Sequence, residues 1–374
     1  MRKIIFTLLF LSAISSLLAQ TCNYQEKHTN NLCKKLQSKD IDIEYIDEFL
    51  LSNEYNSDDK LTLKMINPKK IKYHKKQEIK ANKNLSKYIP KIVKNLRQYK
   101  DIYDLAEQKY KVNREIIAGI LMKETRLGAY KPKHDALQSL ATVYRNTNPD
   151  TKRNKWLHNL SKSNLISLIS YCHKHKLKFE ECKFKSSYIG AIGYAQFMPN
   201  SFRYIVPYES DYSLLDNMPD AILSIANYLH QRGKYNRLFD FDKLDDFGNI
   251  EDDWYRFADT YDNASFSFGS SDNKSKYRCY SCDKSELEEL SLIIKDIMKY
   301  NNSSNYAIGV FSLAYHSHNK PKTQTNYQIH KVQKGETLFL IGLRYNLKYT
   351  TIKRFNNLLN EKLHLGQKLK IPNL

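Results

Sequence analysis

The apolar run at the start of this 374-residue sequence is too short, and too often interrupted by serine, for a comfortable membrane span. A transmembrane helix needs about 20 predominantly apolar residues. Arg2 and Lys3 precede the run, Ile4–Leu18, and the small residue Ala19 follows it, which is the order of a cleaved secretory signal. We predict a signal peptide over residues 1–19 and an exported protein, with an uncleaved anchor as the alternative.

A second CxxC pair is also missing. Cys279 and Cys282 form the one CxxC of the chain, and a lone CxxC is a weak zinc signal. In an exported protein, cysteines are candidates for disulfides. The close spacing of the six cysteines favours the pairs Cys22–Cys33, Cys172–Cys182 and Cys279–Cys282, although sequence alone does not fix the connectivity.

Cys22 also raises the alternative of a lipidated N-terminus. Gln20 and Thr21 are not the small residues usual just before a lipidated cysteine. We therefore expect membrane association only if the signal is retained or Cys22 is lipidated.

Acidic residues are scarce between residues 60 and 100, where fourteen Lys or Arg stand against the single acid Glu78, in a chain of formal net charge +20. Such a stretch is typical of nucleic-acid binding, but an exported protein rarely meets nucleic acid. We expect no nucleic-acid partner. An anionic polymer of the cell envelope fits the same electrostatics, and a solvated lysine-rich surface is the alternative.

The 41% hydrophobic content supports a globular protein with two or three domains. Helical spacing of apolar residues recurs over 41–54, 91–110 and 112–127, and again over 285–299 and 305–316, so the fold is predicted to be mainly α. Residues 240–285, rich in Asp, Ser, Asn and Tyr, predict loops and short strands. We divide the chain into a helical, lysine-rich region 20–85, a larger region 86–318, a linker 319–326 and a small unit 327–374.

The segment NREIIAGILMKETRLG places a carboxylate on an apolar helix face. Glu124 lies three and four residues after Leu121 and Ile120, so it shares their side of the helix. Desolvation penalises a charged carboxylate, which raises its pKa and suits it to general acid catalysis. The alternative is a glutamate that forms an ion pair or hydrogen bond at the end of a helix.

These residues resemble a known family. ILMKETRLG is similar to the glutamate motif of lytic murein transglycosylases, and SYIGAIGYAQFMPNSF closely resembles the GAxGxxQFMPSS signature of the lytic transglycosylase B family (glycoside hydrolase family 103). LQSLATVY, DAILSIANYL and YNNSSNYAIGVFSLA resemble further family segments, in the family's order. The resemblance covers about residues 45 to 318 and implies a lysozyme-like α-helical catalytic domain over 86–318, with a small β/loop insertion, acting as a monomer on peptidoglycan in the periplasm or cell envelope of a bacterium.

The resemblance also implies residue roles. Glu124 corresponds to the catalytic acid/base, and Arg153 to one member of a substrate-holding Arg-Arg pair whose other position is Lys152 here. The remaining substrate-binding candidates are Ser187, Gln196, Tyr228, Tyr300 and Asn301. Plain structural roles remain open: Ser187 and Gln196 as capping residues, and Tyr228 as ordinary packing. One family tyrosine ahead of the glutamate helix has no clear counterpart.

A second catalytic carboxylate is absent near these motifs, whereas hydrolytic glycosidases use two, about 5 to 9.5 Å apart. The resemblance implies a reaction that needs only one catalytic carboxylate. The substrate's own C6 hydroxyl attacks C1 of N-acetylmuramic acid and leaves a 1,6-anhydro end, with Glu124 as sole acid/base. A muramidase, or a non-catalytic cell-wall binding protein, is the alternative.

The calcium loop of the family is altered in VPYESDYSLLDNMPD, where Pro207 stands at the first ligand position and the turn glycine is missing. We expect no cofactor, with weak calcium binding near Glu209, Asp211 and Asp220 left open.

Residues 327–374 resemble a LysM module, with a strand, two helices and a closing strand in βααβ order. A two-stranded sheet needs both helices to bury one face. LysM modules bind N-acetylglucosamine-containing glycans, and the resemblance implies a groove formed by Gly335, Thr337, Leu338, Asn357 and Leu358.

Overall fold

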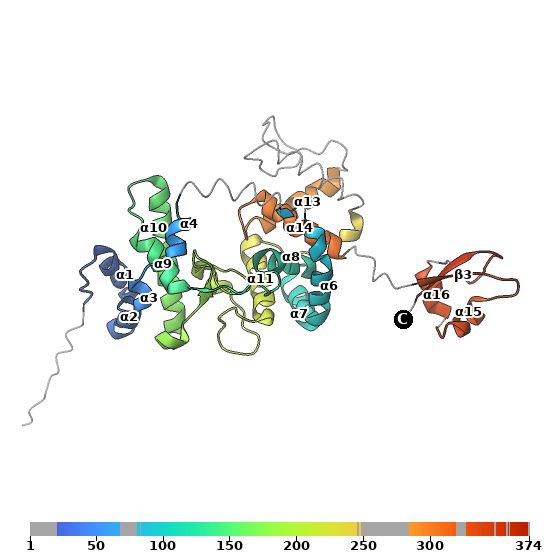
Figure 1. Ribbon diagram of the computed structural model, residues 1–374, viewed down its shortest axis with the longest axis horizontal. Helices are drawn as coiled ribbons and strands as arrows, with labels where there is room; N and C mark the ends of the chain where they lie inside the picture. The colour runs from blue at the N-terminus through green and yellow to red at the C-terminus, as the bar shows by residue number, and fades with distance from the viewer. Residues whose placement is uncertain are drawn as a thin grey trace, which may run out of the picture.

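The computed structural model describes residues 21–67, 81–82, 84–244, 247, 284–318, 327–347, 349–356, 358 and 360–372 (Figure 1). Three separate groups of buried side chains organise these residues. Two lie in the mainly helical part of the chain and one in the C-terminal module.

The first helical group joins the N-terminal helices to two helices from the middle of the chain. Helices α1 and α2 contact α10, and α3 and α4 contact α9, an arrangement that Figure 1 shows in blue and green. Buried Leu, Ile, Phe and Tyr side chains fill the interface. The elements are α1 (Lys27–Gln37), α2 (Ile43–Leu50), α3 (Asn53–Asn56), α4 (Lys60–Met65), α9 (Ala136–Arg145), α10 (Lys152–Lys174) and η3 (Phe179–Glu181).

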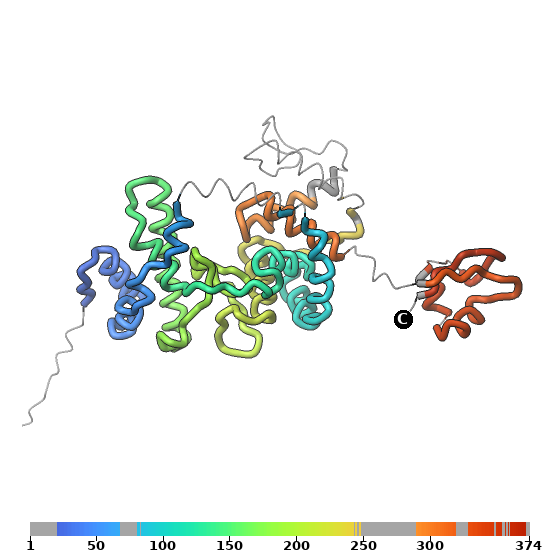
Figure 2. The backbone as a smooth tube through the Cα atoms, in the orientation of Figure 1, coloured from blue at the N-terminus to red at the C-terminus, as the bar shows by residue number. Residues whose placement is uncertain are grey.

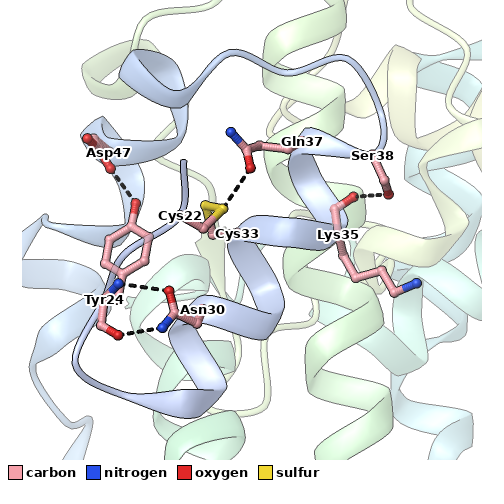
Figure 3. Close-up of a disulfide and its surroundings, with 8 residues drawn as sticks. All are labelled: Cys22, Tyr24, Asn30, Cys33, Lys35, Gln37, Ser38 and Asp47. Carbon is pink, nitrogen blue, oxygen red and sulfur yellow. Dashed lines mark hydrogen bonds between the residues drawn. A yellow bond between two sulfur atoms is a disulfide. The ribbon is translucent and has the colours of Figure 1, made fainter. Parts of the chain in front are cut away.

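Two predicted disulfides are confirmed in this group. Cys22 and Cys33 are bonded with their Cα atoms 5.9 Å apart (Figure 3), and Cys172 and Cys182 with theirs 6.0 Å apart, which is ordinary disulfide spacing. The Sγ atom of Cys22 is therefore bonded to sulfur and cannot at the same time carry a lipid thioether. The third predicted pair, Cys279–Cys282, lies outside the described residues.

The Cys22–Cys33 disulfide lies beside a tyrosine that ties the start of the chain to α2. The Tyr24 hydroxyl donates to Asp47, and the Tyr24 amide donates to Asn30 Oδ1 over 2.8 Å (Figure 3). These bonds fix the chain segment between the two cysteines against the helices.

The second helical group surrounds α8 (Arg114–Thr125), whose residues from Glu115 to Met122 are all buried. Helix α8 packs against α6, α7, α11 and α14, and the tube in Figure 2 shows these segments gathered from distant parts of the chain. The other elements are η2 (Leu85–Tyr88), α6 (Ile89–Gln98), α7 (Lys100–Tyr110), α11 (Met218–Gly233), η5 (Phe241–Lys243), α13 (Lys284–Ile297) and α14 (Ser304–His318).

A small sheet and a loop lie between the two helical groups in sequence. Strands β1 (His134–Asp135) and β2 (Lys185–Ser186) pair antiparallel, and the short helix η4 (Pro199–Tyr204) follows. Isolated bridges then pair Ser186 with Ile192 and Ile192 with Phe197. The chain from Lys185 to Phe197 is thus folded back on itself twice, which gives a compact loop.

The C-terminal module has the predicted βααβ order. Strands β3 (Tyr327–Lys331) and β4 (Lys368–Pro372) pair antiparallel, and α15 (Leu338–Arg344) and α16 (Tyr349–Phe355) lie between them in the chain. The core of the module is formed by its own residues: Val332, Leu338, Ile341, Ile352, Leu369 and Ile371. The module therefore buries an apolar core of its own.

The predicted helix over 91–110 is interrupted, because α6 ends at Gln98 and α7 begins at Lys100. Likewise α8 ends at Thr125, two residues before the end of the predicted range 112–127, because Arg126, Leu127 and Gly128 all adopt left-handed conformations. Most of residues 240–285 lies outside the described chain. Within the described part, no helix has both the length and the apolar character required to cross a bilayer.

Candidate active site

Glu124 lies in the last turn of α8 and is half-buried. The helix on which it lies packs closely against α14. A Cβ atom added to Gly119 would lie 2.9 Å from the Val310 carbonyl oxygen, so glycine permits this approach. The two helices run antiparallel past this contact, which brings the end of α8 to the start of α14.

Tyr306, near the start of α14, is the residue that meets Glu124. Its hydroxyl donates to Glu124 Oε1 over 2.6 Å, and the tyrosine is only 4% exposed. A charge-assisted bond of this kind holds the carboxyl group in a defined orientation. Glu124 is thus a positioned carboxylate at the edge of a packed core.

The opposite ends of α8 and α14 carry a second pair. His318 Nδ1, in the last turn of α14, lies 3.0 Å from Glu115 Oε1, in the first turn of α8. This hydrogen bond is the first cause of a raised His318 pKa. The Glu124–Tyr306 and Glu115–His318 pairs therefore clamp the two helices at both ends.

Lys123 also lies at the site, beside Asn82 and Tyr306. Its Nζ atom donates to Asn82 Oδ1 over 2.7 Å and lies 5.3 Å from the ring centroid of Tyr306. Lys123 is half-buried, as Glu124 is. The lysine therefore places a positive charge next to the tyrosine that binds Glu124.

Tyr300 lies close to the same carboxylate. Its hydroxyl donates to the Ala195 carbonyl, and its ring packs 5.1 Å from the ring of Tyr228 and 6.0 Å from that of Phe197. Burial, and next the negative charge of Glu124, raise the pKa of Tyr300 well above its usual value. Tyr300 therefore stays protonated and keeps its hydrogen bond to the Ala195 carbonyl.

Tyr228, on α11, has a packing role. It is 7% exposed, its hydroxyl donates to the Lys299 carbonyl over 2.9 Å, and its ring lies between those of Tyr204 and Tyr300. The family resemblance implied that Tyr228 binds substrate. The structure instead covers it with protein, because an aromatic side chain on a buried helix face gains most by packing.

Ser187 and Gln196 close the loop after β2. Ser187 Oγ accepts from the Ala191 amide over 3.2 Å, and Gln196 Nε2 donates to the Gly193 carbonyl over 2.8 Å. Gly193 has φ +64°, and an added Cβ would lie 2.2 Å from the Leu215 carbonyl oxygen. The loop geometry thus depends on this glycine. In the same loop, the Ala195 carbonyl accepts a hydrogen bond from the Tyr300 hydroxyl.

Two predicted site residues are less closely connected to Glu124. Arg153, on α10, donates from its guanidinium to the Ile66 carbonyl and lies in the other helical group. Asn301 directly follows Tyr300 in the chain and is exposed. The structure therefore brings together Glu124, Tyr300 and the Gln196 loop, and it gives Arg153 a contact of its own.

The segment that corresponds to the family's calcium loop does not group Glu209, Asp211 and Asp220 as oxygen ligands. Asp220 is buried, and its two carboxylate oxygens accept from the Tyr208 amide and the Asn217 side chain, each over 2.8 Å. Glu209 and Asp211 are exposed. Among the described residues, no three His, Cys, Asp or Glu side chains are grouped for a metal. These residues do not fit a calcium ion, which prefers six to eight oxygen ligands.

The residues predicted to form a groove in the C-terminal module lie in different environments. Gly335 has φ +85° with open space around it, and Thr337 Oγ1 accepts from the Leu340 amide as the cap of α15. Leu338 is 1% exposed and belongs to the module's core, so its side chain is not a groove residue as we expected. Leu358 packs partly against that core, and Asn357 lies outside the described residues.

Sequence reasoning missed Tyr306 and Lys123. A tyrosine in an otherwise apolar segment, YAIGVFSLA, was the available signal for Tyr306. The packing of α8 on α14 decides which tyrosine meets Glu124, and that packing depends on Gly119 and Val310 from distant segments.

The structure defines a mainly helical protein with one positioned carboxylate at the end of a buried helix and a separate βααβ module. The sequence matches the Transglycosylase SLT domain over residues 24–238, which is more than half of the chain, and the LysM domain over residues 330–372. The chain belongs to the transglycosylase SLT family and carries a C-terminal LysM domain. This confirms the family resemblance found in the sequence.

One curated relative is the membrane-bound lytic murein transglycosylase B of Escherichia coli (strain K12), 34% identical over 138 residues. That match spans 36% of this chain and 36% of the relative.

Solved structures confirm the predicted fold class. The Escherichia coli lytic transglycosylase Slt35 in complex with calcium superimposes with a TM-score of 0.56 at 20% identity, covering 81% of this chain and 97% of that one. SltB3 of Pseudomonas aeruginosa, in complex with NAG-anhNAM-pentapeptide, gives a TM-score of 0.51 at 17% identity, with 76% and 77% covered.

Proposed function

We propose that this protein is a lytic murein transglycosylase. It cleaves the β-1,4 bond between N-acetylmuramic acid and N-acetylglucosamine in peptidoglycan and leaves 1,6-anhydromuramic acid ends. The observation that carries the proposal is the hydrogen bond of 2.6 Å between Tyr306 and Glu124, at the end of the buried helix of an SLT domain. It supplies one half-buried and oriented carboxyl group, which is what this reaction requires.

The reaction takes place in two proton transfers. Protonated Glu124 gives its proton to the glycosidic oxygen as the bond to C1 of muramic acid breaks, and N-acetylglucosamine leaves as an alcohol. The carboxylate then accepts the proton of the C6 hydroxyl as that oxygen bonds to C1. No water is consumed, and Glu124 ends protonated as it began.

Tyr306 orients this carboxyl group through both steps. A hydroxyl donor at Oε1 stabilises the carboxylate formed by the first transfer, and the Lys123 ammonium over the Tyr306 ring adds positive charge nearby. Tyr300, held on the Ala195 carbonyl, fixes the loop of Gln196 against the same site. Substrate then contacts that loop and the exposed Asn301.

Ser187, Gln196 and Asn301 are the substrate-positioning residues of this proposal, and Tyr228 acts through Tyr300. Arg153 contacts substrate only at a distance from the cleaved bond, since it belongs to the other helical group. The LysM domain holds N-acetylglucosamine-containing strands through the loop of Gly335 and Thr337. A structural neighbour, SltB3 of Pseudomonas aeruginosa, was solved in complex with NAG-anhNAM-pentapeptide.

The protein acts in the periplasm or cell envelope as a monomer, after removal of residues 1–19. The two disulfides are suited to an oxidising compartment. We propose that no metal cofactor takes part, because the residues near Asp220 do not offer a calcium ligand set.

Digestion of purified sacculi tests the proposal. Wild-type protein is expected to release 1,6-anhydro-muropeptides, identified by mass spectrometry, and the Glu124→Gln variant is expected to release none. Reducing muropeptides would indicate a hydrolase instead. Absence of any release by the wild type would indicate a binding protein.

A further inference from the structure

A pocket of about 600 Å³ opens between α10 and η4. This volume is within the range of about 300 to 1,000 Å³ usual for ligand sites. Three segments that are distant in the sequence form its walls: Lys39 just after α1, the second half of α10, and residues 199–211. Glu124 and Gln196 do not line it. The pocket is therefore separate from the candidate active site.

Aromatic side chains fix the floor of this pocket. The Tyr171 hydroxyl donates to the Ser213 carbonyl and accepts from the Ser213 amide, each over 3.0 Å. The centroid of the Tyr171 ring lies 4.8 Å from that of Phe202 and 4.5 Å from that of His175. These contacts hold α10, η4 and the segment before α11 together, so the pocket is formed before any ligand enters.

The pocket carries more positive than negative charge. Its fully charged residues are Lys39, Lys174, Arg203 and Asp211. The three basic side chains are exposed and form no ion pair within the described part of the chain. Burial, and next the charge of Lys174, lower the pKa of His175 below its usual 6.5, so this ring is mostly neutral at pH 7. Two positive charges are therefore left without a counter-charge from the protein.

One buried hydroxyl in the pocket wall lacks a partner. Ser167, Ser170 and Lys174 follow one another at three- and four-residue spacing, so they share a face of α10. Ser167 Oγ donates to Asn200 Oδ1 over 2.8 Å. Ser170 Oγ is buried and forms no hydrogen bond with any described residue. A buried hydroxyl without a partner lowers stability, and an acceptor oxygen of a ligand would satisfy it.

We propose that this pocket binds a phosphate group, carried by the headgroup of an anionic lipid or free as inorganic phosphate. A phosphate monoester has a charge of about −1.5 to −2 at pH 7 and three strong acceptor oxygens on one phosphorus atom. That charge matches the surplus of the pocket. Lys39, Lys174 and Arg203 bind the oxygens from three separate segments, and Ser170 donates to one of them. The site is independent of the cleavage reaction.

Calorimetry with the full-length protein tests this inference. Inorganic phosphate is titrated at physiological ionic strength, where distant surface charges are screened. The pocket variant Lys39→Gln/Lys174→Gln/Arg203→Gln is expected to bind at least about tenfold more weakly than the wild type, and Ser170→Ala roughly three- to tenfold more weakly. Saturating phosphate should also raise the melting temperature of the wild type and leave that of the pocket variant unchanged.

The matched control is Lys91→Gln/Lys94→Gln/Arg97→Gln, which removes two lysines and one arginine from exposed positions of α6. It changes the net charge equally and should bind phosphate as the wild type does. Melting temperatures without phosphate establish that each variant is folded. Equal weakening in the control and in the pocket variant would mean that binding follows net charge alone, and it would overturn the inference.

Two further ligands identify the chemistry and its source. Succinate has a similar charge on two separate carboxylates and should bind at least about tenfold more weakly than phosphate; equal binding contradicts a phosphate site. Vesicles of phosphatidylcholine with and without phosphatidic acid separate the two sources. Sedimentation of the wild type and the control, but not of the pocket variant, with phosphatidic acid identifies a lipid headgroup. Phosphate binding without such sedimentation identifies the free anion, and binding of neither ligand by the wild type refutes the site.

Discussion

The hydroxyl of Tyr306 is a hydrogen-bond donor to the predicted catalytic residue, Glu124, that the sequence did not reveal. Tyr306→Phe keeps the buried ring and removes the donor to Glu124 Oε1. A hydrogen bond to a charged group contributes about 1.5–3 kcal/mol, so we expect kcat on peptidoglycan to fall by roughly 10- to 100-fold. Because the ring still packs, KM should change little, and the melting temperature should fall by only a few degrees.

Tyr315→Phe is the control for this prediction, because Tyr315 lies on the same helix and its hydroxyl donates to the Leu244 carbonyl over 3.0 Å. It should leave kcat near the wild-type value. A similar loss in both variants would mean that α14 responds to any lost hydroxyl, and the role given to Tyr306 would fail.

Residues near Glu124 also show what sequence could predict. The position of Glu124 on a mostly buried helix and the identity of its family were readable from apolar spacing and ordered motifs. Tyr306 and Lys123 were not, because their roles depend on a contact between helices that are nearly two hundred residues apart. Tyr228 and Leu338 were assigned to ligands and are buried, since a motif does not reveal which face its neighbours cover.

At the scale of elements, the pairing of α8 with α14 carries a pH dependence. The pKa of His318 is raised above its ordinary 6.5, first by the hydrogen bond that its ring donates to Glu115, with Asp242 3.5 Å away as a further acid. A group whose pKa rises on folding stabilises the fold when protonated. This contribution is fully present below pH 6.5 and is lost as pH rises through the raised pKa.

Thermal unfolding of His318→Gln measures this effect. The variant should melt a few degrees below the wild type at about pH 5.5, and the difference should shrink toward about pH 9. His318 also packs 5.0 Å from the ring of Phe241. A difference that stays constant over this pH range would assign the whole effect to that packing and would contradict the ion pair.

The loop before α11 leads to an expectation about calcium. Slt35 was solved in complex with calcium, but here Asp220 already accepts two hydrogen bonds from Tyr208 and Asn217. Saturating calcium or added EDTA should therefore shift the melting temperature by less than about 1 °C, since a ligand stabilises a fold only when it binds the native state. A rise in melting temperature with calcium concentration would reveal a site that these contacts do not predict.

Asp220→Asn is the companion variant in the calcium experiment. It removes the buried charge and keeps the shape of the side chain, so it should lower stability with and without calcium alike. A loss of stability confined to calcium-containing buffer would identify Asp220 as a ligand.

At the scale of the whole molecule, the fold was predictable as a class, while its internal division was not. Regular helical spacing predicted the mainly α region, and the βααβ order of the last residues predicted the LysM domain. The sequence order suggested an N-terminal region followed by a catalytic one. In the structure, α1, α2 and α3 share a core with α9 and α10, because apolar faces far apart in the chain complete one another.

The separate core of the LysM domain suggests that this domain binds the polymer while the helical region cleaves it. That core is built from the domain's own residues, so a chain ending at residue 318 should keep the fold and the Glu124–Tyr306 bond. We expect this truncated chain to cleave small soluble glycan fragments at the wild-type rate. On insoluble sacculi its activity should fall by roughly tenfold or more, because tethering to a polymer raises the effective concentration of the enzyme.

Two measurements check this prediction: initial rates on soluble and insoluble substrate, and the fraction of protein that sediments with sacculi. The catalytically impaired Glu124→Gln full-length chain should sediment as the wild type does, and the truncated chain should remain largely in solution. Equal losses on both substrates would mean that the truncation damages the catalytic body. Unchanged activity on sacculi would mean that the LysM domain has lost its affinity for glycan, and that the charged surface of the helical body suffices for binding.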